Sequence, residues 1–205
     1  MRERLGVRSF PRPAEQDRRS IPASAAEEIM TSNCLLHNTK TCGKRHTIER
    51  ARADKQIRIV HAYDWNTHSD NTALIYEEVM RIADELKQDF PLLFTFQSLG
   101  AKDGSIYCDI CRQIKCADVV IFDLSTYNLN VIFELGLAVG VGTYVFILRS
   151  RHYQRRSGVL SDLNGILEYR FSRRSGRIRF DADFRESLKI KLREAAKCRM
   201  KISKK

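Results

Sequence analysis

"ADVVIFDLSTYNLNVIFELGLAVGVG", residues 117–142, shows most directly how this chain folds. A short apolar run ends at Asp123, and mostly polar residues follow it as far as Asn130. The chain then becomes apolar again, with Glu134 as its one charged residue. A buried parallel strand reads as a nearly continuous apolar run, and Asn is a favoured residue at a helix N-cap. The segment therefore predicts a strand, a turn and a helix that begins near Asn130.

The same alternation continues on both sides of this segment. Apolar runs at 57–63, 92–99 and 143–150 predict three more strands, and apolar residues recur at helical spacing in 70–88 and 105–115. Strands that alternate with helices in this way form a parallel sheet reached by right-handed crossovers. We therefore expect an α/β fold of the flavodoxin-like (Rossmannoid) type, with a sheet of about four to five strands and helices on both faces.

The C-terminal part is more basic and less regular. Residues 167–171 and 177–180 are candidate edge strands, and an amphipathic helix follows them to close the domain. Residues 1–54 mix Pro, Arg, Ser and Glu without periodicity, which predicts a disordered basic extension. The expected organisation is this extension, one α/β domain over 55–200, and a basic tail at 201–205.

The formal net charge of +11 is unevenly distributed. Residues 55–150 carry 8 basic and 12 acidic side chains, whereas residues 151–205 carry 17 basic and 6 acidic ones. The basic excess thus lies outside the expected core. Lysines of the tail have no aromatic residues among them, so we expect only weak, non-specific attraction to nucleic acid from the tail.

The sequence favours a cytoplasmic protein. Six cysteines form no framework of a small secreted domain, and the N-terminus has no apolar signal core. Residues 131–148 approach the length of a membrane span, but Glu134 and the glycines at 140 and 142 predict a helix followed by a buried strand. No membrane segment is expected.

One motif in the extension has metal-ligand residue types. Cys34, His37, Cys42 and His46 form C-x2-H-x4-C-x3-H, a spacing that can hold a tetrahedral zinc ion. The order of ligands matches no standard zinc finger, and the segment has little apolar sequence to fold around a metal. We therefore predict no metal site.

The expected topology predicts where a site lies. Ligands of open parallel sheets bind outside the carboxyl ends of the strands, where the strand order reverses. The first strand leads into Tyr63 and Trp65, and the third leads into Asp123 and Ser125. Glu134 falls within or just after the first turn of the next helix, so all five side chains should lie near one crevice.

A structural role for Glu134 also remains open. The helix macrodipole favours an acidic residue near a helix start, and Asn128 or Asn130 is an ordinary N-cap. Phe133 and Leu135 flank the glutamate, however, in a segment apolar enough to be buried. A carboxylate in such a place must be paired, hydrogen-bonded or functional.

The segment 117–142 resembles the signature of the nucleoside 2-deoxyribosyltransferase-like proteins and of the related TIR-like nucleotide-binding domains. In these groups the third strand ends in an acidic residue, and an Asn-containing turn leads to an aromatic residue followed by Glu-Leu-Gly, as in 133–136 here. The resemblance implies that Glu134 is a catalytic carboxylate acting at the anomeric carbon of a ribosyl or deoxyribosyl unit. It also implies that Asp123 contacts sugar or base, and that the domain self-associates as a homo-oligomer.

The expected function is that of a nucleotide-binding N-glycosidase. Breaking the N-glycosidic bond builds positive charge at C1′, which a fixed carboxylate stabilises or attacks. Tyr63 and Trp65 are candidates to stack on the base, and Ser125, Asn128 and Asn130 are candidates to bind the substrate. The loop after the first strand lacks the glycines of phosphate-binding relatives, which favours NAD as substrate, with no further cofactor. A non-enzymatic nucleotide-sensing or assembly module is the alternative.

Overall fold

The computed structural model describes residues 48–49, 51, 54–66, 69–100, 106–152 and 168–202. The candidate zinc ligands at 34–46 and most of the predicted extension lie outside these residues. The described strands and helices follow in the order β1 (Gln56–Ala62), α3 (Ser69–Lys87), β2 (Leu93–Ser98), α4 (Ile106–Cys116), β3 (Val119–Asp123), α5 (Leu129–Gly140), β4 (Val145–Ser150), β5 (Glu168–Arg174), β6 (Arg177–Phe180) and α6 (Ala182–Ile202).

These strands form one sheet in the order β2-β1-β3-β4-β5-β6. The first five strands in this order are parallel to their neighbours, and β6 is antiparallel to β5. The chain passes from β1 to β2 in one direction along the sheet and from β3 to β4 in the other. The strand order therefore reverses between β1 and β3, where sheets of this kind bind ligands.

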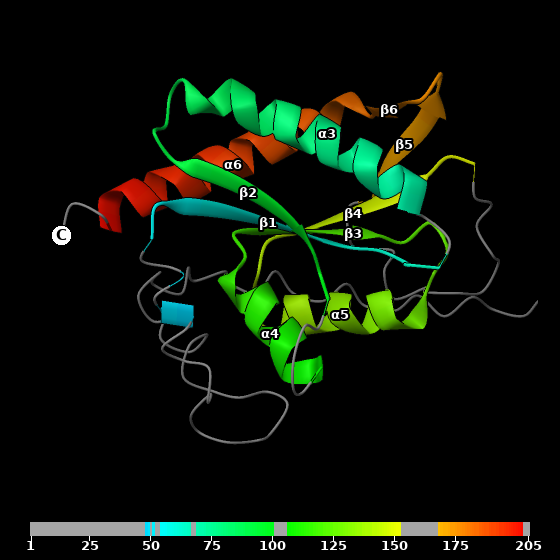
Figure 1. Ribbon diagram of the computed structural model, residues 1–205, viewed down its shortest axis with the longest axis horizontal. Coiled ribbons are helices and arrows are strands. Elements are labelled where there is room, and N and C mark those ends of the chain that lie inside the picture. The colour runs from blue at the N-terminus through cyan, green and yellow to red at the C-terminus, as the bar shows by residue number, and fades with distance from the viewer. Residues whose placement is uncertain are drawn as a thin grey trace, which may run out of the picture.

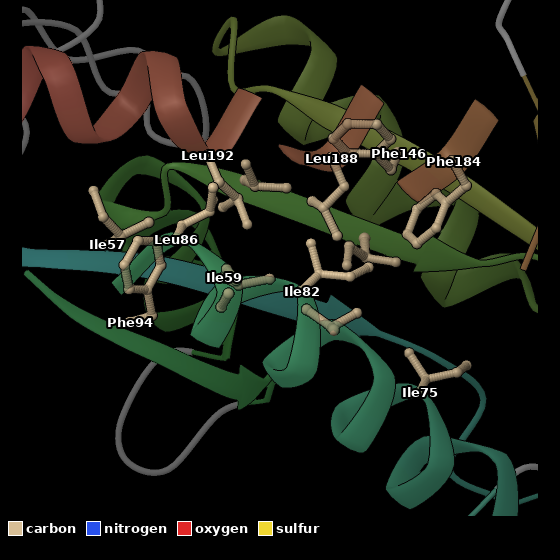
Figure 2. Packing of buried hydrophobic residues seen from close by; sticks show 14 of the residues in the cluster. Ile57, Ile59, Ile75, Ile82, Leu86, Phe94, Phe146, Phe184, Leu188 and Leu192 are labelled. Atoms are coloured by element: carbon tan, nitrogen blue, oxygen red, sulfur yellow. The ribbon is translucent and has the colours of Figure 1, made fainter. Parts of the chain in front are cut away.

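Helices cover both faces of the sheet, α3 and α6 on one face and α4 and α5 on the other (Figure 1). Successive residues of a strand point to opposite faces. Ile59 of β1 accordingly packs into the core under α3 and α6, which Figure 2 shows from close by, whereas its neighbour Val60 packs into the core under α4 and α5. We call these the α3–α6 core and the α4–α5 core.

The α/β class, the mostly parallel sheet and the helical cover on both faces are confirmed. Residues 131–148 also divide as predicted, since α5 ends at Gly140 and Gly142, with φ of 70°, turns the chain toward β4. Among the described residues, no helix is both long enough and apolar enough to span a membrane.

The predicted number of strands was wrong. The sheet has six strands rather than four to five, and β5 is an interior strand between β4 and β6. In β5 the buried Tyr169 and Phe171 alternate with exposed or half-buried polar residues. Such a half-exposed pattern is typical of an edge strand, which is why the sequence did not reveal that β5 extends the parallel sheet.

Ion pairs fix the end of the sheet opposite the predicted site. Arg199 of α6 lies 2.9 Å from Asp118, which also accepts the backbone N–H of Arg58 at 2.8 Å. Burial raises the pKa of Asp118, and the nearby guanidinium of Arg199 opposes this rise. Arg58 pairs in turn with Asp54, and Arg199 donates to the carbonyl of Ala51 at 3.2 Å. The contacts hold α6 against the amino ends of β1 and β3.

Candidate active site

The carboxyl ends of β1 and β3 lie side by side. The parallel register pairs Ala62 with Phe122, so the residues that follow each strand also meet. The hydroxyl of Thr126 donates to Asp64 Oδ2 at 3.1 Å, and the other carboxylate oxygen accepts the backbone N–H of Asn66 at 3.1 Å. The buried Asp64 thus joins the two loops at the point where the strand order reverses.

Asp123 and Ser125 form a buried pair at the end of β3. Asp123 Oδ1 accepts the backbone N–H of Ser125 at 2.9 Å and its hydroxyl at 2.5 Å. The same hydroxyl oxygen accepts the backbone N–H of Ser150 at 2.8 Å. The hydroxyl proton of Ser125 is therefore committed to Asp123, and the side chain connects β3 with β4.

The two asparagines start α5. Asn128 is the N-cap, with its side-chain oxygen accepting the backbone N–H of Asn130 at 2.9 Å. This leaves the exposed side chain of Asn130 as the freer of the two for a ligand. Tyr127, just before the cap, has a φ of 53°, a left-handed conformation that is uncommon outside glycine.

Glu134 lies in the second turn of α5, because this helix starts at Leu129. Its neighbours Val131 and Leu135 are buried against the sheet, while Glu134 itself is half-buried. Among the described residues, no hydrogen bond or ion pair to Glu134 is formed, and burial raises the pKa of its carboxyl to about 7. At neutral pH the carboxyl therefore exists in both protonated and ionised forms, so that it can give up or take a proton.

The aromatic candidates differ in how accessible they are. Tyr63 is buried and stacks on His61 at 5.0 Å and on Trp65 at 5.3 Å between ring centroids. Trp65 remains 62% exposed, although its ring edge lies close to Gly100. Trp65 rather than Tyr63 therefore has ring surface available to a base.

The predicted residues divide between the two faces of the sheet. His61 is two residues after Ile59 on β1 and therefore points to the same face of the sheet. Its ring also contacts Phe96, so the stack of His61, Tyr63 and Trp65 begins on the face covered by α3. Asp123 is two residues after Ile121 and so points to the same face, since Ile121 also belongs to the α3–α6 core. Glu134 is on α5, which covers the other face. The structure thus gathers these residues at one end of the sheet but does not place them on one face.

An aromatic pair that the sequence did not single out lies beside Glu134. Phe133 meets Tyr107 of α4 edge to face, with ring centroids 5.9 Å apart. Both rings are about half exposed, at 48% for Phe133 and 58% for Tyr107. The only signal in the sequence was a Phe next to the candidate carboxylate, in a segment expected to be buried, and Tyr107 became its partner only through the packing of α4 on α5.

A buried arginine was also missed. Arg149, at the end of β4, donates to the hydroxyl of Tyr127 and lies 2.9 Å from Glu168 of β5. Its guanidinium carbon is 5.9 Å from the centre of the Tyr127 ring. Arg149 thus connects Tyr127, the residue with positive φ in the turn from β3 into α5, with β4 and β5. Its position in the apolar run 143–150 was the signal that sequence reasoning did not use.

One hollow among the described residues lies away from the predicted site. It has a volume of about 510 Å³ and lies between α3 and β6, where Leu74, Glu78 and Arg179 are part of its lining. None of its lining residues belongs to the predicted site. We give more weight to the strand ends, because a perturbed carboxyl and exposed rings indicate chemistry. The hollow is lined mostly by charged side chains, of which Arg81 and Glu78 pair with each other.

Comparisons with known proteins add no relative. No protein-family model matches the chain, and no curated protein matches it significantly. Within the described part of the chain, no group of three or more His, Cys, Asp or Glu side chains could hold a metal ion. The fold defines an α/β protein with a mostly parallel six-stranded sheet, and its function must be argued from the site itself.

Proposed function

We propose that this protein is a nucleotide-binding enzyme that cleaves or transfers at an N-glycosidic bond, with NAD hydrolysis as the favoured reaction. One observation carries the proposal. Glu134 is a half-buried carboxyl with a pKa of about 7, on the helix that follows β3, beside the point where the strand order reverses. The resemblance of 117–142 to deoxyribosyltransferase-like and TIR-like domains supports the same role for this residue.

The reaction needs the ionised form of Glu134. Loss of nicotinamide from NAD leaves positive charge on C1′ and the ring oxygen of the ribose. The carboxylate stabilises this charge or bonds to C1′, and water then adds there and releases a proton, giving ADP-ribose. Nicotinamide leaves as a neutral molecule, so no general acid is required. The rate should therefore rise with pH through the pKa of Glu134 and level off above it.

Other residues take supporting roles in this proposal. The resemblance alone assigns Asp123 to orienting the ribose, since its carboxylate is buried and belongs to the other face of the sheet from Glu134. The exposed Trp65 or the pair formed by Tyr107 and Phe133 stacks on the base. The side chain of Asn130 is available to the substrate at the start of α5. Ser125, by contrast, supports the site through its contacts with neighbouring strands rather than by touching the substrate.

The alternative is a nucleotide-sensing or assembly module. The outer side of α5 favours it, because Leu129 is 79% exposed and Phe133 and Val139 are about half exposed. An exposed apolar helix face is typical of a surface that binds another protein. The self-association implied by the resemblance would bring two copies of the chain together, and a non-enzymatic module would use the residues at the strand ends only to bind a nucleotide.

Base release from a panel of substrates separates the two functions. Wild type, Glu134→Gln and the control Glu186→Gln are incubated with NAD, nucleosides and nucleotides, and free base is measured by chromatography. The control changes an exposed glutamate on α6 in the same way. The enzyme proposal predicts base release by wild type and by Glu186→Gln only. Binding of a nucleotide without base release, in all three proteins at high concentration, would support the sensing module instead.

A further inference from the structure

The last two strands form an antiparallel ribbon at the edge of the sheet. β5 and β6 are joined by a two-residue turn in which Ser175 has a φ of 47° and Gly176 a φ of 72°. Positive φ at both central residues is typical of a type I′ turn, whose twist matches that of the flanking strands. The turn sets Arg174 directly opposite Arg177 across the ladder.

The two faces of this ribbon differ sharply in chemistry. Tyr169, Phe171 and Ile178 are buried in the α3–α6 core. The opposite face follows from strand alternation. It carries four exposed arginines, namely Arg170, Arg174, Arg177 and Arg179. We call this set the arginine face.

The positive charge of the arginine face exceeds that of the carboxylates beside it. Asp181, directly after β6, is already paired with Arg151. Arg177 and Arg179 border the hollow that Glu77 and Glu78 of α3 also line, but they form no ion pair with either glutamate. Glu168 is the one acidic residue on this face of the two strands, and it is already engaged by Arg149 at 2.9 Å and by Arg170 at 3.5 Å. Among the described residues, Arg174, Arg177 and Arg179 contact no carboxylate. Like charges that face each other across a ladder destabilise a sheet. The arrangement therefore costs stability in the free protein, and a bound anion would relieve it.

Protection of the sheet edge does not account for these arginines. Charged residues on an edge strand prevent it from pairing with other chains, and this need would explain Arg177 and Arg179 on β6. Arg170, however, lies in the interior part of β5, opposite Arg149 of β4, whereas Arg174 lies in the part of β5 that pairs with β6 alone. A cationic surface that spans two strands points instead to an extended polyanion.

We propose that the arginine face binds the phosphate backbone of double-stranded DNA. Residues two apart on a strand are separated by about 6.6–6.8 Å. The major groove of B-DNA is wide enough to admit a two-stranded ribbon, whereas that of an A-form RNA duplex is too narrow. Arginine is suited to phosphate because its planar group donates two parallel hydrogen bonds. None of the large apolar residues that are exposed on the described surface lies on β5 or β6, whereas a membrane-binding element would present apolar side chains.

The test compares two variants with the same change in charge. One is Arg174→Gln, Arg177→Gln and Arg179→Gln together. The control is Arg193→Gln, Lys197→Gln and Lys201→Gln together, three exposed residues of α6. Fluorescence anisotropy measures binding of a labelled DNA duplex as a function of salt. Thermal unfolding checks that both variants fold, and the first should be no less stable than wild type because it removes facing charges.

We expect the variant of the arginine face to bind the duplex at least about tenfold more weakly. The slope of the logarithm of affinity against the logarithm of salt concentration should become shallower by about 0.9 for each phosphate that the variant no longer neutralises. The α6 variant should bind like wild type, and so should Glu134→Gln, because the arginine face shares no residue with the proposed catalytic site. Absence of duplex binding by wild type would overturn the proposal. An equally large decrease in affinity in both charge variants would do so too, as would tighter binding of wild type to phosphatidylserine vesicles than to the duplex.

Discussion

The hydroxyl of Ser125 accepts the backbone N–H of Ser150 at 2.8 Å and so joins the end of β3 to the end of β4. It donates at the same time to Asp123 at 2.5 Å. These buried contacts fix the start of the turn that leads into α5. The position of Glu134 on that helix therefore depends on a residue that the sequence suggested as a substrate ligand.

Removing this hydroxyl should lower stability. We expect Ser125→Ala to reduce the free energy of unfolding by about 1–3 kcal/mol, because the buried N–H of Ser150 loses its acceptor and the carboxylate of Asp123 loses the hydrogen bond from the hydroxyl, keeping the one from the backbone N–H of residue 125. Ser172→Ala, on the half-buried side of β5, is the control and should change it by no more than about 0.5 kcal/mol. Urea unfolding measures both variants. Equal stability of Ser125→Ala and wild type would show that the hydroxyl does not support the strand ends.

His61 should make the protein sensitive to acid. It is fully buried, neither ring nitrogen has a hydrogen-bond partner among the described residues, and burial lowers its pKa from 6.5 to about 3. The unfolded chain takes up a proton below pH 6.5, whereas the folded protein does not do so until about pH 3. The contribution of His61 to stability is therefore constant above pH 6.5 and falls as the pH decreases between these values, by up to about 1.4 kcal/mol per pH unit.

The variant His61→Phe tests this linkage. Phenylalanine keeps a ring against Tyr63 and Phe96 but cannot be protonated. The free energy of unfolding of the variant relative to wild type should be about 2 kcal/mol higher at pH 5 than at pH 7.5, and urea unfolding at both pH values measures this difference. A difference between the two proteins that does not change with pH would contradict the assignment of His61 as a buried neutral histidine.

Glu134 should act on stability in the opposite direction. Its folded pKa of about 7 lies above the ordinary value of 4.5, so the folded protein binds a proton more readily than the unfolded chain between these values. Stability from this residue is present below pH 4.5 and is lost as the pH rises through 7. Glu134→Gln should therefore melt at a higher temperature than wild type at pH 8, and the two should converge at pH 4. Glu186→Gln should show no such pH-dependent difference.

The ion pair of Arg149 and the half-buried Glu168 should couple energetically. Arg149→Met leaves Glu168 with only the more distant Arg170 and frees the hydroxyl of Tyr127, which should lower the free energy of unfolding by about 1–3 kcal/mol. Glu168→Gln in addition should recover part of this loss, because it removes a charge that has lost its closest partner. Unfolding of both single variants and the double variant forms the cycle that measures the coupling. If the effect of the double variant equalled the sum of the two single effects, the ion pair would not hold this turn.

The sequence predicted the class of fold well because hydrophobic periodicity is a local property. The apolar runs before Asp123 and after Thr143, and the helical spacing between them, were sufficient to place β3, α5 and β4. The role of β5 was harder to predict, since its alternating pattern is equally typical of an edge strand. Its place in the sheet depends on pairing with β4, which periodicity does not encode.

The candidate site was predictable as a location but not as an arrangement. Topology alone brought Asp123, Trp65 and Glu134 to the same end of the sheet. Whether two of these residues share a face depends on which way each strand residue points and on the face that each helix covers. The structure separates Glu134 from the other two. The contact between Tyr107 and Phe133 likewise arises from the packing of two helices. These features depend on contacts between segments that are distant in the sequence, so they cannot be predicted from each segment alone.

The pH dependence of base release from NAD tests the central claim most directly. Release by wild type is measured from pH 5 to pH 9, beside Glu134→Gln and Glu186→Gln, with unfolding checked at each pH. We predict a rate that rises with pH through about 7 and then levels off in wild type and Glu186→Gln, as the carboxyl of Glu134 ionises, and no release by a folded Glu134→Gln. Base release by Glu134→Gln at the wild-type rate would contradict the account.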